Sequence, residues 1–145
     1  MDPRTQVRIL LGLFRDLMRI EGILKNIKAY VWDEMFAVVK VKNIPKISDF
    51  FSIIKDRNEI TLIVKEKQIN EIESIKFENG YRIITFDAIL PFNVVGFIST
   101  VSNALAKKGI SILTVSSYST DHILVKNKDL NKTIGALKDI GIKIE

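Results

Sequence analysis

The sequence of 145 residues contains no cysteine and only one histidine, His122. Without cysteine the chain cannot form disulfides or thiolate zinc sites, and it has no cysteine nucleophile. A single histidine excludes sites that need a pair of histidine ligands, and any histidine-based triad would have to use His122. Beyond Asp121 and His122, no pattern indicates a convergent acid, base and nucleophile. We therefore expect a protein that is not an enzyme, with no catalytic residues, no metal site and no cofactor.

Long apolar runs are also lacking. No segment approaches the ~20 apolar residues that cross a membrane. Charged residues such as Arg8, Arg15 and Asp16 interrupt the apolar residues near the N-terminus, which excludes the architecture of a signal peptide. These absences predict a cytoplasmic protein with no membrane partner. Hydrophobic residues still make up 47% of the chain, which is enough for a sizeable core in one medium domain or two small ones.

Acidic residues are the minority among the charged ones, with 17 Asp and Glu against 22 Lys and Arg. The surplus is greatest in the first 28 residues, which carry six positive and three negative charges. Four of the six arginines, but none of the sixteen lysines, precede residue 20, so residues 1–20 are expected to have a different origin, such as an added leader or an upstream start. No basic stripe interleaved with aromatic residues is present, so we do not expect nucleic acid to be the main partner.

Residues 4–24 form the first segment with a clear period. Apolar residues recur at helical spacing, arginines occupy other faces, and Asp2-Pro3 is a typical helix start. We predict an amphipathic helix whose apolar stripe packs against the sheet of its own chain or against a second subunit, and a membrane surface is a further alternative. The stripe comprises Val7, Leu10, Leu11, Phe14, Leu17, Met18 and Leu24.

After residue 26 the pattern changes to short runs rich in β-branched and aromatic residues, bounded by turn-forming residues. Further along, Asn79-Gly80 lies between two more strand-like runs. Because both residue types tolerate positive φ, we predict a hairpin turn at this dipeptide. The earlier strands are expected at 27–32, 36–41, 50–54 and 59–65.

The C-terminal part alternates strands and helices in a regular order. A strand at about 81–88 precedes a loop and a helix from about Val94 to Lys108, which Asn93 caps and Gly109 closes. The order β-α-β-β-α-β is typical of an antiparallel four-stranded sheet with both helices on one face. The remaining elements are predicted as strands at 110–118, 122–126 and 142–145 and a helix at about 129–139.

An internal repeat links the two halves of the chain. The octapeptide IVKEKQIN at 63–70 is similar to LVKNKDLN at 124–131, with Val, Lys, Lys and Asn matching. The first copy lacks room for a long helix, so we expect it to be an abbreviated version of the same unit. The predicted division is an N-terminal amphipathic helix at 1–25, an abbreviated module at 26–72 and a full module at 73–145.

The segment LPFNVVGFISTVSNALAKKGISILTVSSYSTDHILVK resembles the ACT domain. The similarity is greatest to small tandem ACT proteins related to the aspartokinase regulatory region and to the arginine-sensing CASTOR proteins, and it extends over roughly 27–145. The resemblance implies an α+β fold of tandem ferredoxin-like modules. Two positions depart from the family pattern: Ser117 stands where threonine is usual, and His122 replaces a tyrosine.

The family implies a non-catalytic regulatory module that binds an amino acid where two modules or two subunits meet. Such a ligand needs N–H donors for its carboxylate and acceptors for its ammonium. A helix start supplies donors, and we expect the strand beginning at Ile110 to lie beside the helix start that contains Gly96. By resemblance, the candidate ligand-binding or interface residues are Asn93, Val94, Val95, Gly96, Ser111, Ser117, Tyr118, Thr120 and Asp121.

Structural explanations of these residues stay open. Gly96 can relieve helix packing, the serines can be solvated strand residues, and Asp121 can bond its own turn. His122 can fill the slot of the usual tyrosine or act as a pH switch. Two other functions also remain: an oligomerisation module without ligand, and nucleic-acid binding through the N-terminal helix. A homodimer is expected because modules of this size leave open sheet edges.

Overall fold

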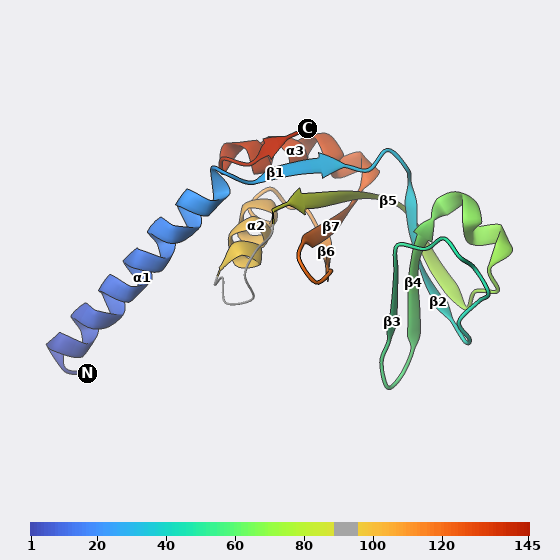
Figure 1. Ribbon diagram of the computed structural model, residues 1–145, viewed down its shortest axis with the longest axis horizontal. Coiled ribbons are helices and arrows are strands. Elements are labelled where there is room, and N and C mark those ends of the chain that lie inside the picture. Colours follow the sequence, from blue (N-terminus) through green and yellow to red (C-terminus); the bar gives the residue numbers. More distant parts are fainter. Residues whose placement is uncertain (89–95) are drawn as a thin grey trace.

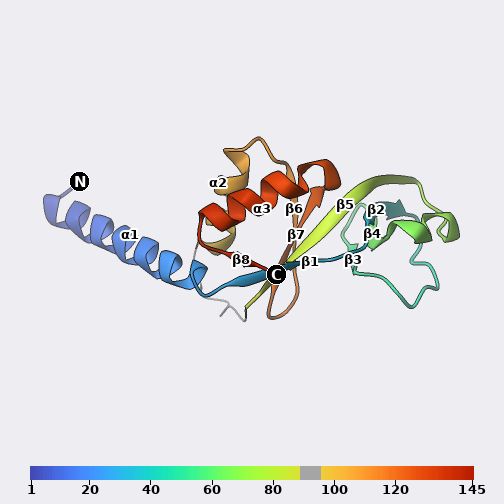
Figure 2. The ribbon, with the colours of Figure 1, turned by 90° about the horizontal axis from the view of Figure 1, so that it is seen from above.

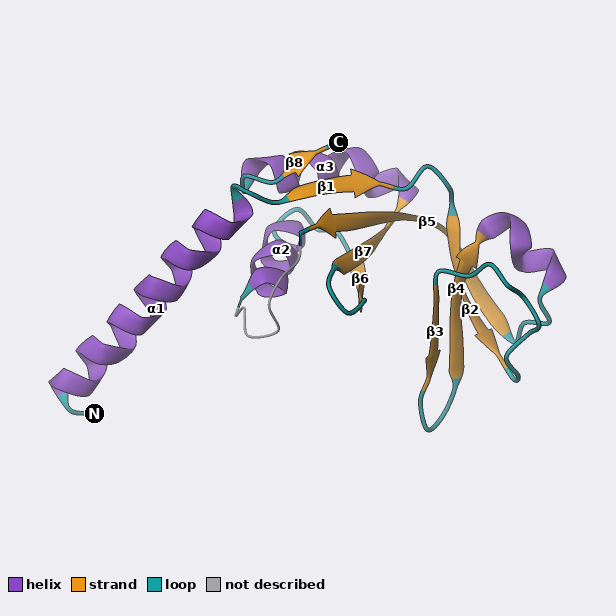
Figure 3. Cartoon of the chain, viewed as in Figure 1, coloured by secondary structure: helices purple, strands orange, loops and turns teal. Residues whose placement is uncertain are grey.

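The structure, a computed structural model, describes residues 1–88 and 96–145. One continuous, bent and mostly antiparallel sheet runs through both halves of the chain, and two helices cover part of it (Figure 1; Figure 3). This is the mixed α+β, ferredoxin-like fold that the sequence predicts. Three of the candidate residues, Asn93, Val94 and Val95, lie outside the described residues.

Helix α1 spans Pro3–Leu24, as predicted. The Asp2 side chain accepts a hydrogen bond from the backbone N–H of Arg4 at 3.3 Å, and a proline occupies the first turn, so the helix begins at a well-formed cap. Near its end, Ile20 and Leu24 are buried in the core. The first part of α1 projects away from the rest of the molecule in both views (Figure 1; Figure 2). Packing against the chain's own body is thus confined to the C-terminal turns of α1.

The N-terminal half-sheet, which consists of β2, β3, β4 and the first part of β5, has the strand order β3-β4-β2-β5. Residues 42–51 contain no helix, and a single 3-10 helix, η1, follows β4, so this half has no counterpart of the long α2. The abbreviated module stays a prediction. The elements are β2 (Phe36–Val41), β3 (Ser52–Lys55), β4 (Ile60–Lys65) and η1 (Glu66–Glu71).

The C-terminal half contains the predicted order β-α-β-β-α-β, and its helices pack on one face of the sheet. Phe97 and Leu105 of α2 and Leu137 of α3 are buried against Phe86 and Ile123 of the strands. The elements are β5 (Lys76–Asp87), α2 (Phe97–Ala106), β6 (Ile112–Ser116), β7 (Asp121–Lys126), η2 (Asn127–Asp129), α3 (Leu130–Asp139) and β8 (Lys143–Ile144).

The predicted hairpin at Asn79-Gly80 is wrong. Strand β5 continues through this dipeptide, with Gly80 at φ 80°. Its pairing with β2 shifts here, since Phe36 faces Tyr81 whereas Val38 faces Glu78, which leaves one extra residue on β5. The positive φ therefore serves a β-bulge, which bends a strand and increases its twist. The bulge lies where β5 passes from its pairing with β2 to its pairing with β7.

Strand β1 (Lys28–Val31) belongs to the C-terminal half-sheet although it precedes β2 in the chain. It pairs antiparallel with β5 and parallel with β8. The C-terminal half-sheet therefore consists of β6, β7, the second part of β5, β1 and β8. The division at residues 72 and 73 stays a prediction, with β1 placed in the sheet of the second module.

The repeat at 63–70 and 124–131 has a structural counterpart. Lys65 ends β4 and Lys126 ends β7, and both are extended, with φ and ψ of −60° and 135° for Lys65 and −62° and 139° for Lys126. A 3-10 helix follows each lysine. The two half-sheets thus share a local unit, which agrees with two related modules.

Candidate functional site

The polar turn between β6 and β7 divides its side chains between two faces of the sheet. Ser116 faces Asp121 across the strands, and its hydroxyl donates to the Asp121 carboxylate at 2.5 Å. The Ser117 hydroxyl instead lies 2.7 Å from the hydroxyl of Thr120 and 3.1 Å from Nε2 of His122. Alternation along the strands explains this division, because successive side chains point to opposite faces.

His122 lies at the centre of a hydrogen-bond chain that crosses the sheet. The indole N–H of Trp32 donates to the Thr85 hydroxyl at 2.8 Å, and that hydroxyl lies 2.8 Å from Nδ1 of His122. Since the indole is donor only, the Thr85 hydroxyl is free to donate to Nδ1, and Nε2 then carries the hydrogen that reaches Ser117. This assignment gives every polar side-chain group of this hydrogen-bond network a partner, and it makes His122 neutral.

The surroundings of His122 reinforce the neutral form. The side chain is buried, and the Phe51 ring meets the imidazole edge to face at 5.1 Å between centroids. Burial lowers the pKa of His122, and the charge of neighbouring Asp121 offsets only part of that effect. His122 is therefore a buried, hydrogen-bonded residue of strand β7.

A cavity of about 430 Å³ lies between the two half-sheets, on the face that carries His122. Small-molecule sites typically enclose a few hundred Å³ with apolar walls and a few placed polar groups. We call it the inter-sheet cavity. Its lining comprises Trp32, Phe36, Asp49, Phe50, Phe51, Ser52, Lys65, Val115, Ser116, Ser117 and His122.

Lys65 and Asp49 place both signs of charge on one wall of the inter-sheet cavity. The ammonium of Lys65 lies 3.3 Å from the carboxylate of Asp49 and 3.3 Å from that of Glu34. The hydrogen bond to Glu34, followed by that to Asp49, raises the pKa of Lys65, so its side chain is charged. Gln68 holds this wall in place by accepting from the Lys65 N–H and donating to the Asp49 carbonyl.

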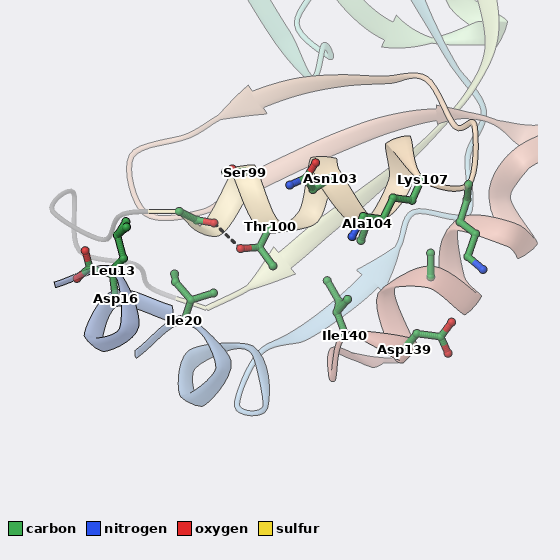
Figure 4. A pocket seen from close by; sticks show the side chains of 13 residues that line it. Leu13, Asp16, Ile20, Ser99, Thr100, Asn103, Ala104, Lys107, Asp139 and Ile140 are labelled. Carbon is green, nitrogen blue, oxygen red and sulfur yellow. Dashed lines mark hydrogen bonds between the residues drawn. The ribbon is translucent and has the colours of Figure 1, made fainter. Parts of the chain in front are cut away.

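Gly96 borders a different hollow, a groove of about 570 Å³ between α1, α2 and α3 (Figure 4). It caps α2 with φ 90°, and its carbonyl accepts from both the N–H and the hydroxyl of Thr100. Among the residues that the structure describes, a Cβ at Gly96 would meet Ile20, at an ordinary 3.7 Å. The backbone conformation, rather than close packing, is therefore what requires glycine here.

The expectation that the strand from Ile110 begins beside the start of α2 is wrong. The N–H of Ile110 donates to the carbonyl of Leu105, so Ser111 follows the end of α2, and the ten-residue helix places it about 15 Å from Gly96. The β6–β7 turn, in contrast, lies at the same end of the sheet as the start of α2 (Figure 1). Of the described candidates, Ser117 lines the inter-sheet cavity and Thr120 contacts Ser117. Tyr118, at 82% exposure, does not line it.

Residues of the cavity that sequence reasoning missed come from the N-terminal half. Lys65 carried one signal, because it is a matching position of the internal repeat. No sequence signal identified Asp49 and Phe51. Both follow a turn-rich stretch, and the pairing of β3 with β4 is what places them at the cavity. Trp32 is the chain's only tryptophan, which makes it a natural reporter of the cavity.

Comparison with known protein families identifies the second half of the chain. A family model described as ACT domain matches residues 76–139, which contain β5 through α3. Residues 76–139 are therefore similar to the ACT domain family. The ACT match includes Gly96, the polar β6–β7 turn and His122. A comparison with curated proteins gives no match.

Solved structures show the same fold over most of the chain. A protein from Agrobacterium tumefaciens is 24% identical with a TM-score of 0.71, and the match covers 82% of this chain and 92% of that one. A Vibrio cholerae protein described as of unknown function and a possible transport protein is 19% identical with a TM-score of 0.70, covering 87% and 98%. The ligand-free regulatory subunit of aspartate kinase from Thermus thermophilus is 11% identical with a TM-score of 0.58, covering 79% and 95%.

Two structural findings concern membranes and metals. Within residues 1–88 and 96–145, no helix combines the length and the hydropathy that crossing a membrane requires. The same residues bring together no group of three or more His, Asp and Glu side chains able to hold a metal ion.

Proposed function

We propose that this chain is a non-catalytic regulatory module that binds an amino acid in the inter-sheet cavity. The observation that carries the proposal is the charge pair of Lys65 and Asp49 on a wall that faces hydroxyls and His122 between two related modules. Relatives of this fold include the regulatory subunit of an aspartate kinase and an aspartate kinase described as allosteric. These similarities support a regulatory role without naming the ligand.

The two charges match the two ends of a free amino acid. The ammonium of Lys65 is placed to bind the ligand carboxylate, and the carboxylate of Asp49 is placed to bind the ligand ammonium. In the structure these groups bond each other, so the ligand exchanges one ion pair for two charge-assisted contacts in a partly desolvated site. The ligand side chain would then lie along the aromatic wall of Trp32 and Phe51.

Binding in this cavity would regulate by biasing the arrangement of the two half-sheets. The cavity wall combines Lys65 of one half with His122 of the other, so a ligand that contacts both favours one relative position. The size of such a shift is limited by the ligand's differential affinity for the two states. The response would pass to a partner or to a homodimer formed through the open edges of β3 and β6.

Other candidate residues fit a second location for the same function. Gly96 caps α2 and borders the groove, whereas Ser111, Tyr118 and Asp121 do not line the inter-sheet cavity. Asn93, Val94 and Val95 precede Gly96 in the sequence and lie outside the described residues. In this alternative, residues from two subunits of a dimer would together bind one amino acid. Substitutions at Lys65 distinguish the two locations, because that residue lines the inter-sheet cavity and does not line the groove at the start of α2.

The test is titration of the protein with each of the twenty amino acids. Binding is measured by calorimetry and by the change in Trp32 fluorescence. We expect one or a few ligands to give heat and to change the fluorescence. Lys65→Gln is expected to weaken binding by about tenfold or more, as charge-assisted contacts contribute ~1.5–3 kcal/mol. Lys67→Gln, an exposed neighbour on η1, is the matched control.

Three outcomes separate the alternatives. If the heat of amino-acid binding is the same for Lys65→Gln as for the parent, the ligand binds at the start of α2 instead. No response to any amino acid, with a dimer present throughout, indicates an oligomerisation module without ligand. Retention on DNA that disappears when α1 is removed and weakens with salt indicates nucleic-acid binding.

A further inference from the structure

Helix α1 exposes an apolar face that nothing in the described chain covers. Leu10 and Phe14 are 64% and 63% exposed, although both are large hydrophobic residues in the middle of a 22-residue helix. Isolated exposed apolar residues are common, but a contiguous apolar face marks an interaction surface. The exposed members are Val7, Leu10, Leu11, Phe14 and Met18.

The flank of α1 that faces the body carries Leu13, which is 55% exposed, and the buried Ile20. Leu13, Asp16 and Ile20 line the groove against α2 and α3, as Figure 4 shows. The exposed apolar face is therefore bounded on one side by the body of the molecule. The helix is held by its C-terminal turns, which leaves the exposed part free to meet a surface alongside the protein (Figure 2).

The arginines of α1 border the exposed apolar face on the other side. Arg4, Arg8, Arg15 and Arg19 are spaced four, seven and four residues apart, which places them on one stripe of the helix. This stripe lies next to Leu11 and Met18, which follow Arg8 and Arg15 by three residues. Among the ion pairs of residues 1–88 and 96–145, none involves these four arginines.

We propose that α1 docks in the plane of an anionic lipid bilayer. Amphipathic helices with Leu and Phe on one face and arginines beside it bind membrane surfaces by burying the apolar face and pairing the cations with lipid phosphates. Within the described residues the four arginines form no ion pair, and an anionic surface supplies the missing negative charge. This mode needs no spanning segment, so it is compatible with the lack of a membrane-crossing helix.

A second copy is a poorer complement for this face. In a two-fold antiparallel pair of α1 helices, the same flank of each helix comes together, so Arg8 and Arg15 would meet arginines of the other copy. Of the two acidic residues of α1, Asp16 lines the groove, and Glu21, seven residues after Phe14, lies near the end of the helix in line with the exposed apolar face rather than within the arginine stripe. Like charges at such a seam destabilise pairing.

The test is flotation of the full-length protein with vesicles of phosphatidylcholine alone and with vesicles that also contain phosphatidylglycerol. We expect flotation with the anionic vesicles only, weakened by added salt. Arg8→Gln and Arg15→Gln are each expected to reduce the affinity about fivefold. The double variant Leu10→Gln/Phe14→Gln is expected to abolish flotation. Arg57→Gln and Ile44→Gln, at exposed positions outside α1, are the matched controls.

Several results overturn the proposal. One is the absence of flotation with anionic vesicles at low salt, and another is flotation that the α1 variants leave unchanged. A lipid-free dimer in sedimentation equilibrium that Leu10→Gln/Phe14→Gln dissociates assigns the face to a second copy. Binding of duplex DNA that depends on the arginines but not on Leu10 and Phe14 assigns the stripe to nucleic acid. Circular dichroism of each variant verifies that α1 is retained.

Discussion

Nδ1 of His122 lies 2.8 Å from the hydroxyl oxygen of Thr85, which faces it directly across β7 and β5. The same hydroxyl accepts the indole N–H of Trp32, so one threonine connects residues that are 53 and 37 positions away from it in the chain. These contacts join the strand that carries the polar turn to the segment that links the half-sheets. The environment of the only histidine therefore reports on the whole inter-sheet cavity.

The protein is expected to lose stability as the pH falls below about 6.5, the ordinary pKa of histidine. Burial lowers the pKa of His122 in the folded chain, so the unfolded chain binds the proton more readily. The stabilisation is complete above the unfolded pKa and is lost as the pH falls toward the folded value. Because the chain has one histidine, its imidazole resonances in proton NMR measure this pKa directly.

His122→Gln is the control for that titration, because it keeps a polar strand residue and removes the titrating group. Its midpoint of thermal unfolding is expected to vary less than that of the parent between pH 7.5 and 5.5. A folded-state pKa at or above 6.5 would contradict the neutral, buried assignment.

Thr85→Val is expected to destabilise the fold by about 1–3 kcal/mol, the cost of leaving buried polar groups without a partner. The substitution keeps the shape of the side chain but deprives the Trp32 indole and the His122 imidazole of their shared hydroxyl. Urea unfolding measures the change. Thr114→Val, on an exposed position of β6, is the matched control and is expected to have little effect. Equal stabilities for the two variants would show that the chain of hydrogen bonds contributes nothing.

Gly80→Ala and Gly135→Ala are expected to change the free energy of unfolding in opposite directions: the first lowers it and the second raises it. No atom lies within 4 Å of a Cβ built at either position, so steric clashes do not enter. Gly80 has φ 80°, where alanine costs about 1–2 kcal/mol. Gly135 lies inside α3, where alanine gains about 0.5–1 kcal/mol. A neutral Gly80→Ala in denaturant unfolding would mean that the bulge does not need the left-handed conformation.

Leu105→Ala and Leu10→Ala compare the core with the exposed face of α1. Leu105 is fully buried in α2, so truncation is expected to cost about 2–5 kcal/mol. Leu10 is exposed, and its truncation in the lipid-free protein is expected to change the stability by less than about 0.5 kcal/mol. A cost for Leu10→Ala close to that of Leu105→Ala would show that an assembly covers α1 in solution.

Elements whose signal is local could be predicted from the sequence. The period of apolar residues located α1, and the Pro3 and Gly109 signals placed helix ends near their observed positions. Asn79-Gly80 shows the limit of such signals. Positive φ suits a hairpin turn and a bulge equally, and the choice depends on β2, which lies forty residues earlier in the chain and pairs along the start of β5.

The candidate site was predictable only in part, for a similar reason. The polar turn could be recognised from its composition, and Ser117 does line the cavity. The charges opposite it come from Lys65 and Asp49, whose position depends on how one half-sheet lies against the other. Long-range strand pairing also places β1 between β5 and β8, which no local pattern indicates.

Because β1 pairs with β8, the C-terminal half-sheet is built from two segments that are not adjacent in the sequence. Strand β8 pairs only with β1, and the whole N-terminal half-sheet is nested between β1 and the second part of β5. A single cut at residue 72 therefore cannot release an intact C-terminal half, because the fragment would leave behind the neighbour of its last strand. Two crossings of the chain, at residues 32–35 and through β5, connect the halves, so the C-terminal half can be excised intact only together with the segment that contains β1.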